Sequence, residues 1–234
     1  MSGSAMRLDH VVIVVAQLDA AVAAYRAAGF TVVPGGSHPG RSTRNALVVF
    51  EDGAYLELIT YDAPSPQERW WQVLSHHGTG LVDFALLPQD IEAVVAAARQ
   101  RGLARITGPH PGGRVRPDGV QLAWQTARQA THDLPFLCAD VTPRALRVPE
   151  GEVRRHANGA LGIAEVAVAV RDVEATLARW RAFLGAEAVA DGQVRLADCR
   201  ITLRPEPQRA RGEGPCAVSL AVAGGSGKVE LPGC

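Results

Sequence analysis

Three parts of this chain have side chains that could do chemistry, all within its first 61 positions. His10 stands at the start of one apolar run, and Glu57 lies within another, in the segment GAYLELIT. Imidazole and carboxylate groups are ligands that Zn, Fe, Mn and Ni accept, and two protein ligands leave coordination positions for a substrate. Taken alone, a histidine at the start of a strand is more often a hydrogen-bonded structural residue. A glutamate in an apolar strand is often half of an ion pair.

The third part is the loop GGSHPGRSTRN, residues 35 to 45. Its glycines and proline shape a tight path. Its donors are His38, Arg41, Thr43, Arg44 and Asn45. Arginine and backbone donors suit anionic oxygen, so the composition fits a clamp for a substrate carboxylate or carbonyl. An ordinary solvated turn is the alternative.

The elements around these residues follow a β-α-β-β-β order. Val11 to Val15 is a β-branched apolar run that suits a buried strand, and Ala20 to Ala28 is rich in helix formers. Asp19 is a plausible N-cap for this helix and Gly29 a plausible C-cap. Further strands are expected at 30–33, 46–50 and 54–61, the last two joined by an Asp-Gly turn.

The same order recurs along the chain. A second copy starts at Leu81, with Asp90 and Gly102 as helix caps, and PDGVQLAWQT repeats the pattern of EDGAYLELIT. A third copy covers 161–189, followed by strands at 193–196 and 200–203, and a partial fourth would start near 216–222. Such repetition at a fixed period indicates a repeated structural unit.

We therefore expect an α+β fold of paired βαβββ modules that form a cupped antiparallel or mixed sheet, with a third module. One unit is a half-cup, two complete a cup, and a pocket is expected where the two meet. The predicted division is a domain at 7–140 (modules 7–61 and 80–140), a Pro/Arg-rich linker at 141–159, and the third module with the partial fourth at 160–234. The third module is expected to complete its sheet with the partial strand near 216–222. It could also pack on the first pair or on another subunit, which would make a homodimer.

A family resemblance joins these observations. The segments LDHVVIVV, AAGF, GGSHPGRSTRNAL and GAYLELI resemble the glyoxalase-like branch of the vicinal-oxygen-chelate superfamily, the glyoxalase/bleomycin resistance/dioxygenase type. The resemblance is strongest over residues 7–61, clear in order to about 140, and fainter over 160–205. It implies paired βαβββ modules that hold a divalent metal on their first and last strands, where the metal polarises a bidentate oxygen substrate.

The resemblance also implies roles for particular residues. His10, Glu57 and Asp83 become candidate metal ligands, for Zn, Fe, Mn or Ni. Glu57 and His38 become candidate catalytic groups, and the candidate substrate-binding residues are Asn45, Arg41 and Thr43. Glu165 takes the place of His10 in the third copy, whereas the counterparts of Glu57 are Ala123 and Thr202, so the ligand set is incomplete. Without metal, a buried Glu57 would need a partner or would act as a general base with a raised pKa.

Three functions stay open at this point. The first is a metal-dependent lyase, isomerase or dioxygenase acting on a small oxygenated metabolite. The second is a metal-free protein that sequesters a drug or metabolite, which the incomplete ligand set and the pair Trp70-Trp71 favour. The third is a redox-inert scaffold whose last module mediates association.

Composition and missing motifs exclude other classes. With 24 basic and 24 acidic residues and no basic run, the chain offers nothing to nucleic acid. Dinucleotide, P-loop and serine-hydrolase motifs are absent, so no nucleotide cofactor is expected. No secretory signal or membrane-length apolar run occurs, and four widely spaced cysteines indicate reduced thiols. We therefore expect a soluble cytoplasmic protein with a small-molecule partner.

Overall fold

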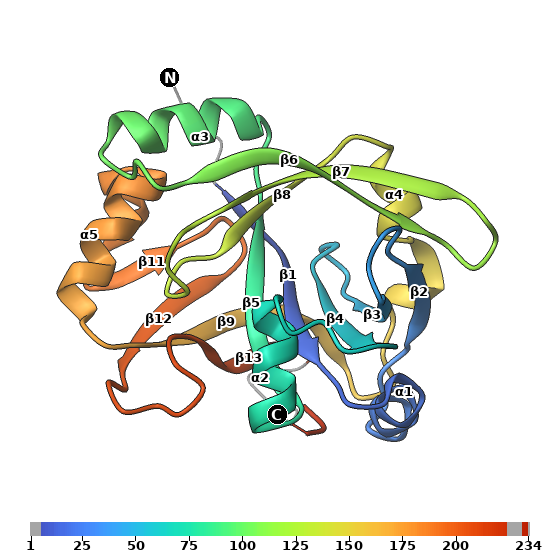
Figure 1. Cartoon of the computed structure of the whole chain (residues 1–234). Helices are drawn as coiled ribbons and strands as arrows, with labels where there is room; N and C mark the ends of the chain where they lie inside the picture. Colours follow the sequence, from blue (N-terminus) through green and yellow to red (C-terminus); the bar gives the residue numbers. More distant parts are fainter. Residues whose placement is uncertain (1–5, 224–230, 234) are drawn as a thin grey trace.

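The α+β architecture expected from the repeats is confirmed by the computed structural model, which describes residues 6–223 and 231–233. An eight-stranded sheet closes into a barrel in the order β1-β4-β3-β2-β6-β7-β8-β5, and a second sheet has the order β10-β11-β12-β9-β13. In Figure 1, α5 lies beside the second sheet and α3 crosses one end of the molecule.

The barrel is built from two modules. The first contains β1 (Arg7–Val14), α1 (Leu18–Ala27), β2 (Val33–Ser37), β3 (Thr43–Val49) and β4 (Tyr55–Tyr61). After α2 (Arg69–His77), the second contains β5 (Gly80–Leu87), α3 (Ile91–Gln100), β6 (Thr107–Val115), β7 (Gln121–Arg128) and β8 (Phe136–Asp140). In each module the first strand pairs in parallel with the last, and β1 pairs antiparallel with β5 between the modules. The expected cup is thus a closed barrel, because β2 also pairs with β6.

A short helical segment connects the barrel to the second sheet. It comprises α4 (Arg144–Arg147) and the 3-10 turn η1 (Gly151–Arg154). The second sheet then contains β9 (Ala160–Val170), α5 (Val173–Leu184), the 3-10 turn η2 (Ala186–Ala188), β10 (Val189–Ala190), β11 (Gln193–Arg195), β12 (Arg200–Pro205) and β13 (Gly214–Val222). The strand expected near 216–222 is β13, which pairs antiparallel with β9 as β5 pairs with β1.

Two expectations about local structure were wrong. The α1 helix starts at Leu18 after Gln17, and Asp19 lies in its first turn without capping it, whereas Asp90 and Asp172 both cap their helices by accepting a backbone N–H. The strand predicted at 30–33 is β2, which begins only at Val33 and takes in the first glycines of the polar loop.

The sequence-based alignment of the second module with the first was also wrong by one strand. The Asp-Gly turn of the first module joins β3 to β4, but that of the second joins β6 to β7. The counterpart of β4 is therefore β8 and not β7. Register shows the consequence: Val12 pairs with Glu57 in the first module and Ala85 with Phe136 in the second. Phe136, and not Ala123, occupies the place of Glu57.

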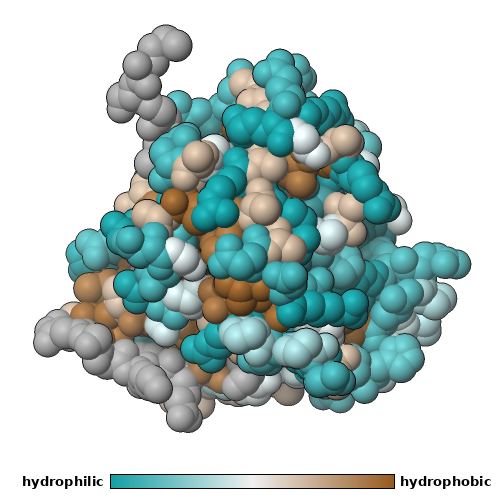
Figure 2. All heavy atoms as spheres, turned by 90° about the vertical axis from the view of Figure 1, so that its left-hand side faces the viewer, coloured by the Kyte–Doolittle hydropathy of each residue, from teal (hydrophilic) through white to brown (hydrophobic). Residues whose placement is uncertain are grey.

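The largest hydrophobic cluster packs the outer face of the barrel against the second sheet, and a separate cluster lies inside the barrel. Trp180 of α5 is fully buried, and its ring packs 6.5 Å from that of Phe84 on β5. The face of the molecule on the α5 side is mostly hydrophilic, with small hydrophobic areas (Figure 2). No helix in the described ranges has both the length and the apolar character for a membrane crossing. The domain boundaries and the cytoplasmic location stay predictions.

Candidate functional site

The candidate site is a cavity of about 220 Å³ inside the barrel. His10, Glu57, His38, Asn45 and Arg41, which come from the first module, all line it. The other lining residues are Pro39, Tyr55, Ile59, Trp70, Pro111, Gly112, Gly113, Arg114, Trp124, Thr126, Arg128, Phe136, Cys138 and Arg147. The structure thus brings together most of the residues singled out from the sequence.

Strand alternation turns His10 and Glu57 into this cavity. Val12 and Val14 belong to the hydrophobic cluster inside the barrel, whereas Val11 and Ile13 belong to the core outside it. Because side chains alternate along a strand, His10 lies on the inner face with Val12. Glu57 is directly beside Val12 on the parallel strand β4.

Glu57 is the centre of the polar cluster. Asn45 Nδ2 donates to its Oε1 at 2.5 Å, His10 Nε2 lies 3.6 Å from Oε2, and His38 Nε2 lies 4.0 Å from Oε1. Burial by itself raises the pKa of Glu57, but His10, His38 and the Asn45 hydrogen bond outweigh it and lower the pKa below its usual value. The carboxylate is therefore ionised at neutral pH, so of the two alternatives expected for a buried Glu57 the structure shows the one with partners.

His10 is held by its sequence neighbour Asp9. The Asp9 carboxylate lies 2.6 Å from His10 Nδ1, and the imidazole stacks on the ring of Tyr55 at 4.7 Å between centroids. Adjacent residues of a regular strand point to opposite faces. Here the register between β1 and β5 shifts at Asp9, between Leu8 and His10. Such a bulge re-aims a side chain and brings the carboxylate to the imidazole.

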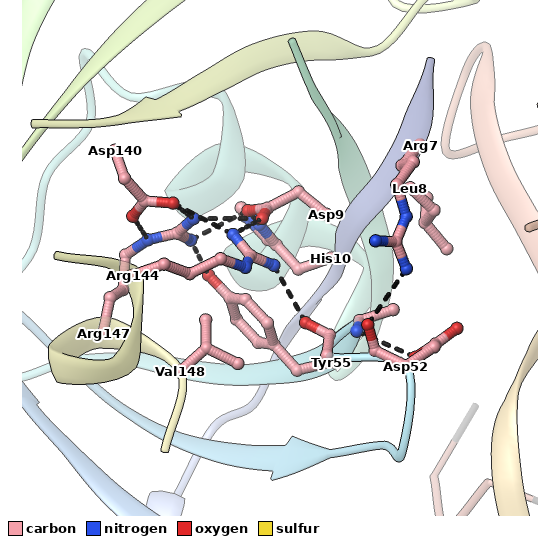
Figure 3. Close-up of polar contacts among 12 residues, drawn as sticks. Arg7, Leu8, Asp9, His10, Asp52, Tyr55, Asp140, Arg144, Arg147 and Val148 are labelled. Carbon is pink, nitrogen blue, oxygen red and sulfur yellow. Dashed lines mark hydrogen bonds and ion pairs between the residues drawn. The ribbon is translucent and has the colours of Figure 1, made fainter. Parts of the chain in front are cut away.

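Asp9 is in turn held by two arginines of α4. Its fully buried carboxylate receives hydrogen bonds from Arg147 at 2.8 and 3.0 Å and from Arg144 at 2.6 Å. Both arginines also bind Asp140, the last residue of β8, and Arg147 donates to the Tyr55 hydroxyl at 2.7 Å. Figure 3 shows the two side chains reaching from α4 toward the start of β1. Spacing i, i+3 puts them on one face of the single helical turn.

These contacts determine which of the groups around His10 are charged. Burial alone raises the pKa of Asp9, but Arg147 and the hydrogen bond with His10 hold it well below the usual value. Burial raises the pKa of the Tyr55 hydroxyl well above its usual value, although Arg147 acts in the opposite direction. Asp9 is therefore an anion that orients His10, and Tyr55 is a neutral phenol.

His38 lies nearest to Oε1 of Glu57, whereas His10 lies nearest to Oε2. Its Nδ1 is 2.9 Å from the Thr43 hydroxyl and 3.3 Å from the Thr43 carbonyl oxygen, which leaves Nε2 toward Glu57. Burial lowers the pKa of His38 and Glu57 raises it, with a net lowering that keeps the ring neutral at neutral pH. Thr43, expected to bind substrate, is buried behind His38 and contacts it directly.

The rim of the cavity is cationic and aromatic. Arg41 forms a bidentate ion pair with Glu68 and is partly exposed. Arg128 lies with its guanidinium carbon 4.2 Å from the ring centroid of Phe136 and 5.1 Å from that of Trp70. Cation–π contacts of this kind keep a guanidinium against an apolar wall.

Asp83 is not brought together with His10 and Glu57. Its carboxylate accepts from Trp70 Nε1 at 3.0 Å and from Arg128 at 3.3 Å, and it lines an adjoining cavity of about 260 Å³. The antiparallel register explains this, because Asp83 is opposite Val12 and not opposite His10. Within residues 6–223 and 231–233, no three His, Cys, Asp or Glu side chains are grouped so that they could hold a metal ion.

The donor atoms nevertheless fit a metal held by two protein ligands. Metal-bound histidines commonly donate their other ring N–H to a carboxylate, and Asp9 is placed to accept one from His10 Nδ1. This arrangement leaves His10 Nε2 for coordination, 3.6 Å from an ionised oxygen of Glu57. Two metal–ligand bonds of about 2.0–2.2 Å span such a separation.

In the second sheet the equivalent positions hold no such site. Glu165 occupies the place of His10, and Thr202 the place of Glu57, as expected. Thr202 donates to Glu165 at 2.9 Å, and Arg200 pairs with the same carboxylate at 2.7 Å. Glu165 is thus part of a surface ion pair.

Sequence reasoning missed several residues of the site. Asp9, Arg144 and Arg147 form the support of His10, and Arg114 and Phe136 line its cavity. The arginines had been assigned to a linker, since nothing local in the segment shows that it folds back on β1. Asp9 next to His10 was the one available signal, because a carboxylate beside a histidine is a possible orienting partner.

Paired βαβββ modules around a His/Glu cavity define the vicinal-oxygen-chelate class, to which this chain belongs. A family model for the glyoxalase-like domain matches residues 8–184, both barrel modules and the start of the third. The chain is therefore a member of the glyoxalase-like domain family. None of the curated proteins compared matches it.

Of three similar solved structures, the first two support the fold alone. A hypothetical protein from Staphylococcus aureus is 18% identical, with a TM-score of 0.68, over 85% of this chain and 86% of that one. A mutant of 4-hydroxymandelate synthase from Streptomyces coelicolor is 15% identical, with a TM-score of 0.59, over 93% of this chain and 71% of that one. Methylmalonyl-CoA epimerase from Streptomyces coelicolor is 24% identical, with a TM-score of 0.43, over 59% of this chain and all (100%) of that one.

Proposed function

We propose that this protein is a glyoxalase-like enzyme that acts on a small oxygenated metabolite by isomerisation, lysis or ring-opening oxygenation. The observation that carries the proposal is the chain of contacts Asp9–His10–Glu57, in which an anion orients an imidazole next to an ionised carboxylate. Such perturbed, mutually oriented groups inside a cavity are typical of catalytic sites.

His10 Nε2 and Glu57 would hold a divalent metal of the Zn, Fe, Mn or Ni type. When bound, the metal would polarise the substrate oxygens as a Lewis acid. Asp83 is left out of the proposed ligand set because Trp70 and Arg128 occupy its carboxylate.

The other residues would position the substrate and move a proton. His38 is neutral, and its Nε2 is within reach of a substrate atom placed near Glu57, so it can accept or deliver a proton there. Asn45 keeps the Glu57 carboxylate in one orientation through its 2.5 Å hydrogen bond. Trp70 and Trp124 would exclude water from the substrate.

Metal analysis of protein purified without chelator tests this proposal. We expect a divalent metal that is lost in His10→Ala and Glu57→Ala and retained in His77→Ala, a control histidine that is exposed on α2. Asp9→Asn should weaken metal binding about 10–100-fold in a direct metal titration. No metal in the wild type, or equal metal content in all variants, would contradict the metal-dependent proposal.

A metal-free binding protein is the second candidate. The aromatic wall, the presence of Phe136 in the place of a second glutamate and the pairing of Asp83 with Arg128 favour it. The cavity of about 220 Å³ is below the range of about 300–1,000 Å³ usual for drug-sized ligands, which favours a small metabolite. Saturable binding without turnover, equal in metal-free and metal-loaded protein, would identify this candidate.

A further inference from the structure

Two buried arginines in the candidate site have opposite electrostatic surroundings. Arg147 is 2% exposed and pairs with Asp9 and Asp140. Arg114, at the end of β6, is 3% exposed and lines the same cavity. Among the described residues, no carboxylate oxygen lies within the 4.0 Å of an ion pair from Arg114.

The hydrogen bonds of Arg114 do not compensate its charge. Nη1 lies 3.4 Å from Asn45 Oδ1 and Nη2 donates to the carbonyl oxygen of Arg147 at 3.1 Å, both neutral acceptors. Nε, in the described part of the chain, is buried without any hydrogen-bond partner. A guanidinium has five N–H donors and does not lose its charge in proteins. A buried ion without a direct counter-charge destabilises the folded protein.

The backbone is shaped to keep this guanidinium in place. A Cβ atom added at Gly35 would lie 2.0 Å from Asn45 Oδ1 and 2.9 Å from Arg114 Nη1. Glycine on β2 therefore leaves the space in which Arg114 reaches the cavity. On the same strand as Arg114, a Cβ at Gly112 would lie 2.4 Å from Trp124 Nε1, so that wall also depends on glycine.

From this we infer that Arg114 is the receptor for an anionic group of the ligand, and that the substrate class is a small monocarboxylate with a second oxygen near Glu57. Glu57 attracts Arg114 from beyond ion-pair distance, and the ligand carboxylate would supply the direct partner that Arg114 lacks among the described residues. Arg–carboxylate pairs are charge-assisted and directional, so Arg114 would also orient the substrate toward His10 and Glu57. The inference rests on the proposed function, since it assigns a substrate class to the same cavity.

Calorimetric titration with pyruvate and with its neutral amide, pyruvamide, tests the inference. Metal-stripped protein at low salt is used, so that binding is measured independently of the metal and of turnover. We expect the wild type to bind pyruvate at least tenfold more tightly than pyruvamide, and Arg114→Met to lose this preference. Arg116→Met is the matched control, because Arg116 pairs with Asp118 and is not among the residues that line the cavity.

Thermal unfolding distinguishes a ligand-binding role of Arg114 from a purely structural role. If Arg114 is a receptor, Arg114→Met keeps or raises the unfolding midpoint without ligand, and pyruvate no longer raises it. If Arg114 only supports Asn45 and the carbonyl of Arg147, the midpoint falls and the preference for pyruvate persists, which overturns the inference. A wild type that does not distinguish pyruvate from pyruvamide overturns it too.

Two further variants complete the test. Arg114→Gln replaces Arg114→Met if the latter does not fold, and Arg114→Lys should retain part of the preference because it keeps the charge but not the planar fork. His10→Ala, which tests the proposed function, should keep the pyruvate preference. If the wild type contains no metal but prefers pyruvate to pyruvamide through Arg114, the metal proposal is contradicted and the inference about Arg114 stands.

Discussion

The guanidinium of Arg147 donates at 2.8 Å to the carboxylate of Asp9, across 138 positions of sequence. Through this contact a helix of one turn between the two sheets supports the first strand of the barrel. Asp9 in turn holds His10 at 2.6 Å, so the orientation of the candidate metal ligand depends on α4. The segment between the two sheets is part of the site.

Loss of Arg147 should destabilise the protein. Arg147→Met leaves the buried Asp9 with Arg144 as its one remaining arginine partner, and removing one partner of a buried pair costs about 3–5 kcal/mol. We expect the lower end, about 3 kcal/mol, because Arg144 remains. Urea unfolding measures the change. Arg155→Ala, at an exposed ion pair with Glu152, should change the free energy of unfolding by no more than about 0.5 kcal/mol and serves as control.

Asp9 should make stability depend on acid pH. Its pKa is lowered in the folded protein, so its stabilising contribution is complete above the usual aspartate pKa of about 4 and is lost as the pH falls below it. We expect Asp9→Asn to be less stable than the wild type at pH 7 and the difference to shrink toward pH 3. Unfolding curves at several pH values measure this. A constant difference would contradict the ion-pair explanation.

Gly35 should tolerate no side chain. In Gly35→Ala the new Cβ would displace Asn45, and Glu57 would lose its 2.5 Å hydrogen bond. We expect a destabilisation of about 1–3 kcal/mol from overpacking and at least a tenfold loss of pyruvate affinity. Gly40→Ala is the control from the same loop. It has open space at a φ of +73°, so it should cost only about 1–2 kcal/mol and leave pyruvate binding intact.

The buried cysteines should be unreactive. Burial raises the pKa of the Cys138 and Cys199 thiols to about 12, which leaves almost no thiolate at pH 8. Cys216 is half-buried, and Cys234 lies outside the described residues. With iodoacetamide at pH 8, peptide mapping should show Cys138 and Cys199 modified only after denaturation. Rapid labelling of Cys138 in the native protein would mean that the cavity opens.

Two of the cavity residues that emerged from the sequence, His10 and Glu57, share a local origin. His10 and Glu57 stand on the first and last strands of one module, and these strands pair in parallel. Their proximity follows from the internal order of that module, which hydrophobic patterning and turn residues already express. The family pattern then assigned them to one site.

The prediction that Ala123 is the counterpart of Glu57 in the second module was wrong for a physical reason. Two Asp-Gly turns occupy different connections of the two modules, and a turn motif specifies a reversal of the chain but not which strands it joins. Only the strand register shows that Phe136 occupies the place of Glu57. The register likewise moves Asp83 away from His10.

The sequence by itself determined the repeated module and the identity of the two residues at the centre of the cavity. These depend on side-chain periodicity and capping, which act over a few residues. Only the tertiary structure decided which charges meet there, that Arg147 holds Asp9 and that Arg114 has no acidic partner within 4.0 Å in the described part of the chain. The pairing of Arg147 with Asp9 joins residues 138 positions apart. The electrostatic consequences of these contacts depend on burial, which exists only once the barrel has closed.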